Sequence, residues 1–218
     1  MNITDYLNAK FPGLSLEPPL FYGWKTAIRF ELGDPELFGI DGEHYLERVY
    51  VRAAELFKAL HHPEDDIVLV ADAFFTKVSK GQAHKLNLYQ RYIKNKKILR
   101  HIRMEMIPDD SDESDDASID PPWYIHRYWL ACKTGEIKYM PLIQAICNQD
   151  MALRPKMKHR VFFINLTQGT IFHIYDDRGC DVISVTPDTL REVYKKYNGW
   201  ILEHDREAID RVFNGKAE

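Results

Sequence analysis

The chain has 218 residues and a formal net charge of −4, and 45% of its residues are hydrophobic, 12% aromatic and 28% charged. This composition is typical of a folded globular protein and is too apolar for an intrinsically disordered one. No leader pattern and no run of about 18 apolar residues occurs, so we expect a cytoplasmic protein that neither enters nor crosses a membrane. The three cysteines lack metal-ligand and CxxC spacing, which predicts reduced thiols and no structural zinc.

Charge is unevenly distributed along the chain. Residues 73–104 contain nine Lys or Arg and no acid, whereas residues 109–120 contain seven acids and no base. The acidic stretch has few apolar residues and ends at two prolines, so we expect an acidic mobile loop over residues 109–122. This loop divides the chain into an N-terminal α+β half, residues 1–108, and a C-terminal α+β half, residues 123–218, which we expect to form one compact unit.

In the N-terminal half, apolar residues recur at helical spacing over residues 46–60, behind Asp41 as N-cap and ahead of Pro63. This pattern predicts a helix. Three other segments are rich in β-branched and aromatic residues, which predicts strands: 24–32, 66–75 and 97–106. We expect a further helix over residues 82–93, between the last two strands.

The C-terminal half begins with two strand-like segments, residues 123–132 and 136–140, on either side of Lys133-Thr134-Gly135. This arrangement predicts a β-hairpin. A helix is expected next, over residues 141–147.

Three short apolar runs follow, separated by connections that each end in glycine: 161–166, 170–176 and 180–185. Gly169 and Gly179 close the connections, as expected where a type I turn is followed by a residue with positive φ. The pattern predicts a three-stranded meander. Two helices should follow, one starting at Pro187 and one over residues 205–213. Together the elements predict an α+β fold, mainly an antiparallel sheet with the C-terminal meander and flanking helices.

The second connection of the meander determines which polar side chains lie together. If residues 177–179 form it, Tyr175 lies opposite Asp181; a two-residue connection would oppose Asp176 and Asp181, and opposed like charges are unfavourable. The favoured register places His173, Tyr175 and Asp181 on one face, where a carboxylate could orient an imidazole for acid and base catalysis. A buried histidine with one hydrogen bond explains the pattern more simply. Residues 177–179 would then form only a turn, which the Asp177 side chain stabilises.

A longer segment from about Ile171 to Phe213 contains IYDDRGCD, LREVY, KYNGWIL and DREAID. This segment resembles the carboxy-terminal signature of a bacterial family, the domain of unknown function 3885. The family has no established activity. The resemblance therefore implies a bacterial, cytoplasmic protein and no catalytic residues.

Two further patterns could carry a function. Glu136 and Lys138 lie 16 and 18 residues after Asp120, the acid-then-ExK arrangement of metal-dependent nucleases, in which carboxylates hold Mg²⁺. Such a short motif is common by chance. The basic segment 77–103 could bind nucleic acid, although a solvated basic surface facing the chain's own acidic segment 109–120 is the simpler interpretation.

These patterns favour a non-enzymatic, protein-binding function, as in an immunity protein that blocks a toxin or another enzyme. The one-sided charge could steer such a partner, and no cofactor or metal is expected. The residues expected to bind the partner are basic: Lys94, Lys96, Lys97, Arg100 and Arg178. A metal-dependent nuclease or other hydrolase, and a nucleic-acid-binding module formed by residues 77–103, remain as alternatives.

Overall fold

The computed structural model describes residues 2–34, 37, 42–76, 87–108 and 123–215. A seven-stranded sheet forms the centre of the molecule, in the order β1-β7-β6-β5-β2-β4-β3. Its strands are β1 Ala27–Glu31, β2 Asp66–Thr76, β3 Arg103–Pro108, β4 Trp123–Lys133, β5 Arg160–Asn165, β6 Thr170–Ile174 and β7 Gly179–Ser184. All neighbouring strands are antiparallel. The predicted α+β fold with an antiparallel sheet is confirmed.

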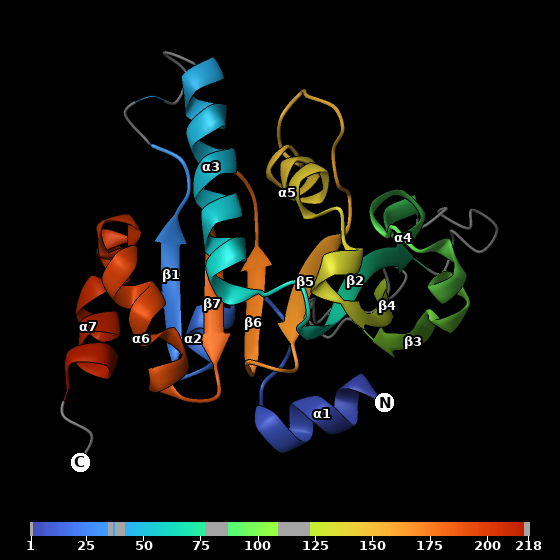
Figure 1. Cartoon of the computed structure of the whole chain (residues 1–218), viewed down its shortest axis with the longest axis horizontal. Coiled ribbons are helices and arrows are strands. Elements are labelled where there is room, and N and C mark those ends of the chain that lie inside the picture. Colours follow the sequence, from blue (N-terminus) through green and yellow to red (C-terminus); the bar gives the residue numbers. More distant parts are fainter. Residues whose placement is uncertain (1, 35–36, 38–41, 77–86, 109–122, 216–218) are drawn as a thin grey trace, which may run out of the picture.

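Helices cover both faces of the sheet and the β1 edge (Figure 1). The α-helices are α1 Ile3–Lys10, α2 Leu20–Gly23, α3 Gly42–Leu60, α4 Asn87–Tyr92, α5 Tyr139–Cys147, α6 Pro187–Lys196 and α7 Arg206–Asn214. The 3₁₀-helices are η2 Lys96–His101, η3 Thr134–Glu136, η4 Asn198–Trp200 and η5 Glu203–Asp205. The predicted helices 46–60, 141–147 and 205–213 correspond to α3, α5 and α7, and α6 starts at Pro187 as expected.

Two hydrophobic cores lie on opposite faces of the sheet. The larger core contains Ile28, Phe30 and Val182 together with apolar residues of α3 and α5. The smaller core contains Ala27 and Ile183 together with residues of α1. Since alternate residues of a strand point to opposite faces, each strand of the β1–β7 pair contributes side chains to both cores.

Strands from both halves of the sequence pair within this one sheet. The N-terminal strand β1 pairs with β7 in the register Arg29 opposite Asp181, and β2 pairs with β5 in the register Val70 opposite Phe162. These pairings place residues from distant parts of the sequence side by side in the sheet. The expected acidic loop 109–122 and the N-cap Asp41 lie outside the described residues.

The predicted strand 97–106 is wrong in its first half, because residues 96–101 form η2. The Asn95 side chain accepts a hydrogen bond from Lys97 N at 3.1 Å, which starts the helical turn. Ile98 and Leu99 then pack against the larger core. A short apolar run fits a helix or a strand equally well, and here the cap decides between them.

The predicted hairpin around Lys133-Thr134-Gly135 is also wrong. β4 pairs along its length with β2 and with β3 instead of turning back on itself. After Lys133 the chain enters η3, where Thr134 N donates to Asp65 O at 3.0 Å and Gly135 N donates to Pro63 O at 2.8 Å. These bonds attach η3 to the segment between α3 and β2, so residues 136–140 do not turn back to pair with β4.

The C-terminal meander is confirmed, but its second register is two residues away from the predicted one. His173 lies opposite Asp181, and Tyr175 N donates to Gly179 O at 3.2 Å, so the connection comprises residues 176–178. The turn is held by Asp176, whose Oδ1 accepts from Arg178 N at 2.7 Å, and not by Asp177 as predicted. A shift of two residues leaves every side chain on its predicted face.

Of the two connecting glycines, only Gly169 has the predicted positive φ, of 67°. Gly179 lies in β7 and is required for a different reason. A Cβ atom at Gly179 would lie 2.1 Å from the Tyr175 hydroxyl and 2.7 Å from Phe30 O. The glycine therefore permits the close approach of β1 and Tyr175.

Candidate functional site

A cavity of about 680 Å³ opens near the C-terminal end of β1, and we call it the β1 cleft. It is lined by Pro18, Pro19, Arg29, Glu31, Gly33, Tyr45, Tyr175, Arg178 and Leu202. Its size is within the range typical of small-ligand sites, about 300–1,000 Å³, and its walls combine apolar surface with a few polar groups. The cleft brings together Tyr175 and Arg178, two of the residues singled out from the sequence.

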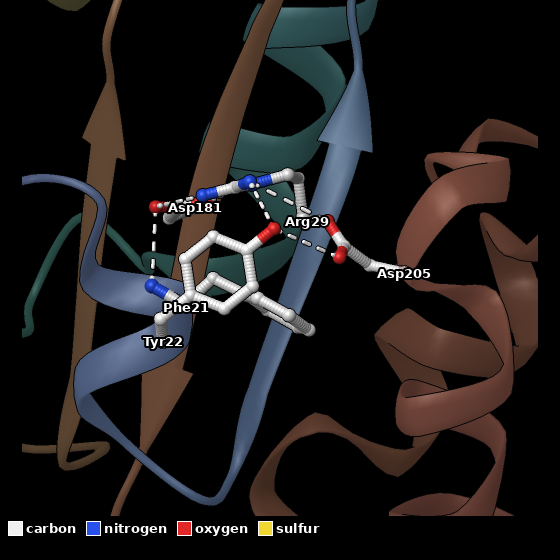
Figure 2. Close-up of polar contacts among 5 residues, drawn as sticks. All are labelled: Phe21, Tyr22, Arg29, Asp181 and Asp205. Carbon is white, nitrogen blue, oxygen red and sulfur yellow. Dashed lines mark hydrogen bonds and ion pairs between the residues drawn. The ribbon is translucent and has the colours of Figure 1, made fainter.

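Arg29 is one of the polar residues that line the cleft. Two carboxylates hold it in place (Figure 2). Its Nε donates to Asp181 Oδ1 at 2.8 Å and its Nη1 lies 3.4 Å from Asp205 Oδ2. Tyr22 donates its hydroxyl hydrogen to Asp205 Oδ1 at 3.1 Å, and Phe21 N donates to Asp181 Oδ2 at 3.2 Å. The network joins α2, β1, β7 and η5 at one point.

The charge of Arg29 is permanent in this setting. Burial acts to lower the pKa of Arg29, but the hydrogen bond and the negative charge of Asp181 outweigh it and raise that pKa above its ordinary value. Asp181 is fully buried, whereas the Arg29 side chain is 11% exposed. Arg29 is therefore a fixed cation, with most of its hydrogen-bonding capacity used inside the protein.

The turn between β6 and β7 forms the rim of the cleft. Asp177 accepts a hydrogen bond from the Tyr45 hydroxyl at 2.6 Å, and burial together with this bond raises the pKa of Tyr45. Asp176 accepts from Arg178 Nε at 2.8 Å. Both aspartates are buried, while the Arg178 side chain is 76% exposed. The turn therefore presents a guanidinium group to solvent above two engaged carboxylates.

Three groups that line the cleft have unused hydrogen-bonding capacity. The Glu31 carboxylate, the Tyr175 hydroxyl and Nη1 of Arg178 make no hydrogen bond or ion pair with any residue that the structure describes. The charged residues of the cleft and of its network include two more acids than bases: Glu31, Asp176, Asp177, Asp181 and Asp205 against Arg29, Arg52 and Arg178. The β1 cleft therefore favours a ligand group that is cationic and can also donate hydrogen bonds.

The predicted acid and base cluster is not assembled. His173 lies opposite Asp181, but its Nδ1 is 2.8 Å from Val161 O and its ring stacks on Phe162. Burial lowers the pKa of His173 to about 4, so this histidine is neutral at pH values near 7. Burial also raises the pKa of Tyr175. The simpler interpretation, a core histidine with one hydrogen bond, agrees with this geometry.

Glu136 and Lys138 lie far from the β1 cleft, beside the segment that follows α4. Glu136 Oε2 accepts from Asn95 N at 3.1 Å, and Lys138 N donates to Tyr92 O at 2.7 Å. Both residues thus connect η3 to the preceding chain, and Asp120 lies outside the described residues. Among the residues that the structure does describe, no group of three or more His, Cys, Asp or Glu side chains could hold a metal ion.

The five predicted binding residues do not form one surface. Lys94, Lys96, Lys97 and Arg100 lie in or just before η2, which precedes β3, whereas Arg178 directly precedes β7 near the other edge of the sheet. Lys94 Nζ donates to Gly135 O at 2.5 Å and Lys96 Nζ donates to Ile93 O at 2.5 Å. Two of the four lysine and arginine residues beside β3 therefore hold loops in place.

The sequence did not single out Arg29, Glu31 or Tyr45. A signal was present in the predicted strand 24–32, where Arg29 and Glu31 alternate with Ile28 and Phe30. Two charged residues on one face of a strand between apolar neighbours indicate a polar site on that face.

Comparison with known proteins gives a family. The chain belongs to the family described as Domain of unknown function (DUF3885), whose model matches residues 3–205. The chain is similar to "Uncharacterized protein YnaE" of Bacillus subtilis (strain 168), with 30% identity over 215 residues, which cover 94% of this chain and 99% of the relative. The predicted family resemblance is thereby confirmed, and the relative is bacterial. No solved structure matches. No helix within the described ranges is long and apolar enough to cross a membrane.

Proposed function

We propose that this member of the family acts by binding a partner protein without catalysis, and that the β1 cleft receives a basic side chain of that partner. The observation that carries the proposal is the pair of cleft acceptors with unused hydrogen-bonding capacity, the Glu31 carboxylate and the Tyr175 hydroxyl oxygen. They line a cavity that is already formed. Preformed sites bind without an ordering cost, which favours recognition.

A lysine or arginine side chain of the partner has an aliphatic stem and a charged end, and the cleft has groups that match each of them. The aliphatic stem would contact Pro18, Pro19 and Leu202, which form apolar walls. The charged end would pair with the Glu31 carboxylate and donate to the Tyr175 hydroxyl oxygen. The surrounding excess of carboxylates favours the same sign of charge, although Arg178 opposes it at the rim.

The state of the candidate catalytic groups supports binding over catalysis. His173 is buried and neutral, and Asp181 is engaged by Arg29 and by Phe21 N. Burial raises the pKa of Cys180, and a thiol needs a lowered pKa to act as a nucleophile. A protein that blocks a toxin or another enzyme needs none of these groups to react, so an immunity-type function is consistent with them.

The proposal is tested by Glu31→Gln, which removes the free carboxylate charge and keeps its shape. Immobilised wild-type and variant protein are incubated with lysate of the native host, captured proteins are quantified by mass spectrometry, and the affinity of the enriched partner is then measured. Loss of one member of a charged pair at an interface costs about 2–5 kcal/mol, so at least about a tenfold loss of affinity is expected.

The matched control is Glu64→Gln, since Glu64 is exposed and is not part of the β1 cleft. This variant should bind the partner like the wild type. Equal partner affinity for Glu31→Gln and Glu64→Gln would contradict a role of the β1 cleft in binding.

A further inference from the structure

The opposite edge of the sheet is an open strand. β3 pairs with β4 on one side, and among the residues that the structure describes no strand lies on its other side. An edge strand presents main-chain N–H and C=O groups that can pair with another chain. Met104 and Met106 are 51% and 61% exposed, and both point to the same face of β3.

Exposed basic side chains directly precede this edge strand in the chain. Lys97 and Arg100 are exposed on η2, which directly precedes β3, and Arg103 is exposed at the start of the strand. Residues 73–104 contain no acid, and the one acid of β3, Glu105, is partly buried and lies opposite Arg127 of β4. We use the name β3 surface for the strand β3 together with Lys97 and Arg100.

We propose that the β3 surface binds an extended acidic segment of a partner protein, which adds to the sheet as a strand beside β3. Main-chain hydrogen bonds to β3 would supply affinity, as in other cases of strand addition. Alternate apolar side chains of the segment would contact Met104 and Met106, whose flexible thioethers adapt to varied shapes. Acidic side chains of the segment would pair with Lys97 and Arg100, which gives complementary charge.

The alternative ligand for a basic surface is nucleic acid. Phosphate binding requires positive charge but neither an open strand edge nor exposed methionines. An acidic peptide is favoured because the open strand edge and the exposed methionines occur together with basic residues. The proposal is independent of the β1 cleft, which lies at the other edge of the sheet and favours the opposite charge.

The probe is a fluorescent synthetic peptide of about eight residues in which Leu or Val alternates with Glu, since strands of this length are typical. Binding to the full chain is measured by anisotropy at about 50 and 200 mM NaCl, and weaker binding is expected at the higher salt concentration. Lys97→Glu with Arg100→Glu should weaken binding at least about tenfold, because attraction becomes repulsion. Met104→Thr with Met106→Thr keeps strand propensity and should weaken binding through the lost apolar contact.

Two controls and one further measurement separate the proposal from simpler explanations. The variant Lys195→Glu with Lys196→Glu reverses the same number of positive charges on α6, remote from β3. It should bind the peptide like the wild type. A peptide N-methylated at every residue lacks the N–H donors of both of its edges, so it cannot form the strand ladder and should not bind. Peptide binding should also slow hydrogen exchange of amides in residues 103–107.

Absence of peptide binding, or binding without any change in the exchange of those amides, would overturn strand addition. A single-stranded oligonucleotide of similar length that binds more tightly than the peptide, and equally well to the methionine variant, would reassign the surface to nucleic acid and overturn the proposal.

Discussion

Replacement of Asp181 by asparagine should destabilise the fold strongly, although the two side chains have nearly the same shape. Asp181 is fully buried and accepts from Arg29 Nε at 2.8 Å, Arg29 Nη2 at 3.3 Å and Phe21 N at 3.2 Å. Asparagine has one acceptor oxygen and one NH₂ group. Whichever way the amide is turned, the NH₂ group faces an N–H donor of Arg29 or Phe21.

The magnitude follows from what remains around Arg29. Breaking a buried ion pair by removing one partner costs about 3–5 kcal/mol, because the other charge stays buried without compensation. Arg29 keeps Asp205 at 3.4 Å and is 11% exposed, so the lower end of this range applies. We expect the free energy of unfolding to fall by about 3 kcal/mol, which for a chain of this size lowers Tm by about 6–12 °C.

The assay is urea unfolding followed by circular dichroism, together with calorimetric Tm values. The control is Asp188→Asn, because the Asp188 side chain is 85% exposed and, within the described part of the chain, pairs only with Arg191 on the surface. Exposed ion pairs contribute little to stability, so this variant should unfold close to the wild type. If Asp181→Asn loses no more stability than Asp188→Asn, the argument from the buried network is refuted. A loss of function in Asp181→Asn is therefore no evidence of catalysis, unless the variant is shown to be folded.

Two further outcomes follow from the structure. Gly179→Ala should lower the free energy of unfolding by about 2–3 kcal/mol, because the new Cβ would lie 2.7 Å from the main-chain oxygen of Phe30. The control Gly42→Ala has no atom within 4 Å of its Cβ and should be neutral or stabilising, so equal urea midpoints for the two variants would contradict the argument. Stability should also fall as the pH decreases from about 6.5 to about 4. Burial lowers the pKa of His61 and of His173 to about 4, so in this pH range the unfolded chain binds more protons than the folded protein does. Each histidine adds a slope of up to about 1.4 kcal/mol per pH unit, and a urea midpoint that is unchanged between about pH 7 and 5 would show that these histidines are not buried as neutral groups.

Local patterns in the sequence predicted the elements whose structure is determined locally. The helical spacing of apolar residues in α3 and the glycine-separated runs of the meander each lie within a short stretch of chain. The faces of β6 and β7 were also predictable, because an error of two residues in register does not change the face on which a side chain lies. His173 and Asp181 thus appear on one face, as expected.

The β1 cleft could not be predicted in the same way, because its residues come from parts of the chain that only the tertiary fold brings together. Arg29 and Asp181 are 152 residues apart in sequence, and Tyr45 and Asp177 are 132 residues apart. The pairing of β1 with β7 brings Arg29 opposite Asp181, and α3 brings the Tyr45 hydroxyl to Asp177. No periodicity within β1 reveals its neighbour, and the short strand fits many partners equally well.

The two edge strands differ in whether their outward main-chain groups are already hydrogen-bonded, and this difference determines how each edge can bind a partner. At β1 the chain covers its own edge: Leu202 N donates to Arg29 O at 3.0 Å, and Arg52 Nη1 donates to Glu31 O at 3.0 Å. Main-chain groups of β1 are thus already used, and a partner at the β1 cleft must be recognised through side chains such as Glu31. The described residues place no comparable donor beside β3, where Met104 and Met106 are exposed. A partner at the β3 surface can therefore pair with the main chain itself, and charge then selects which partner it is.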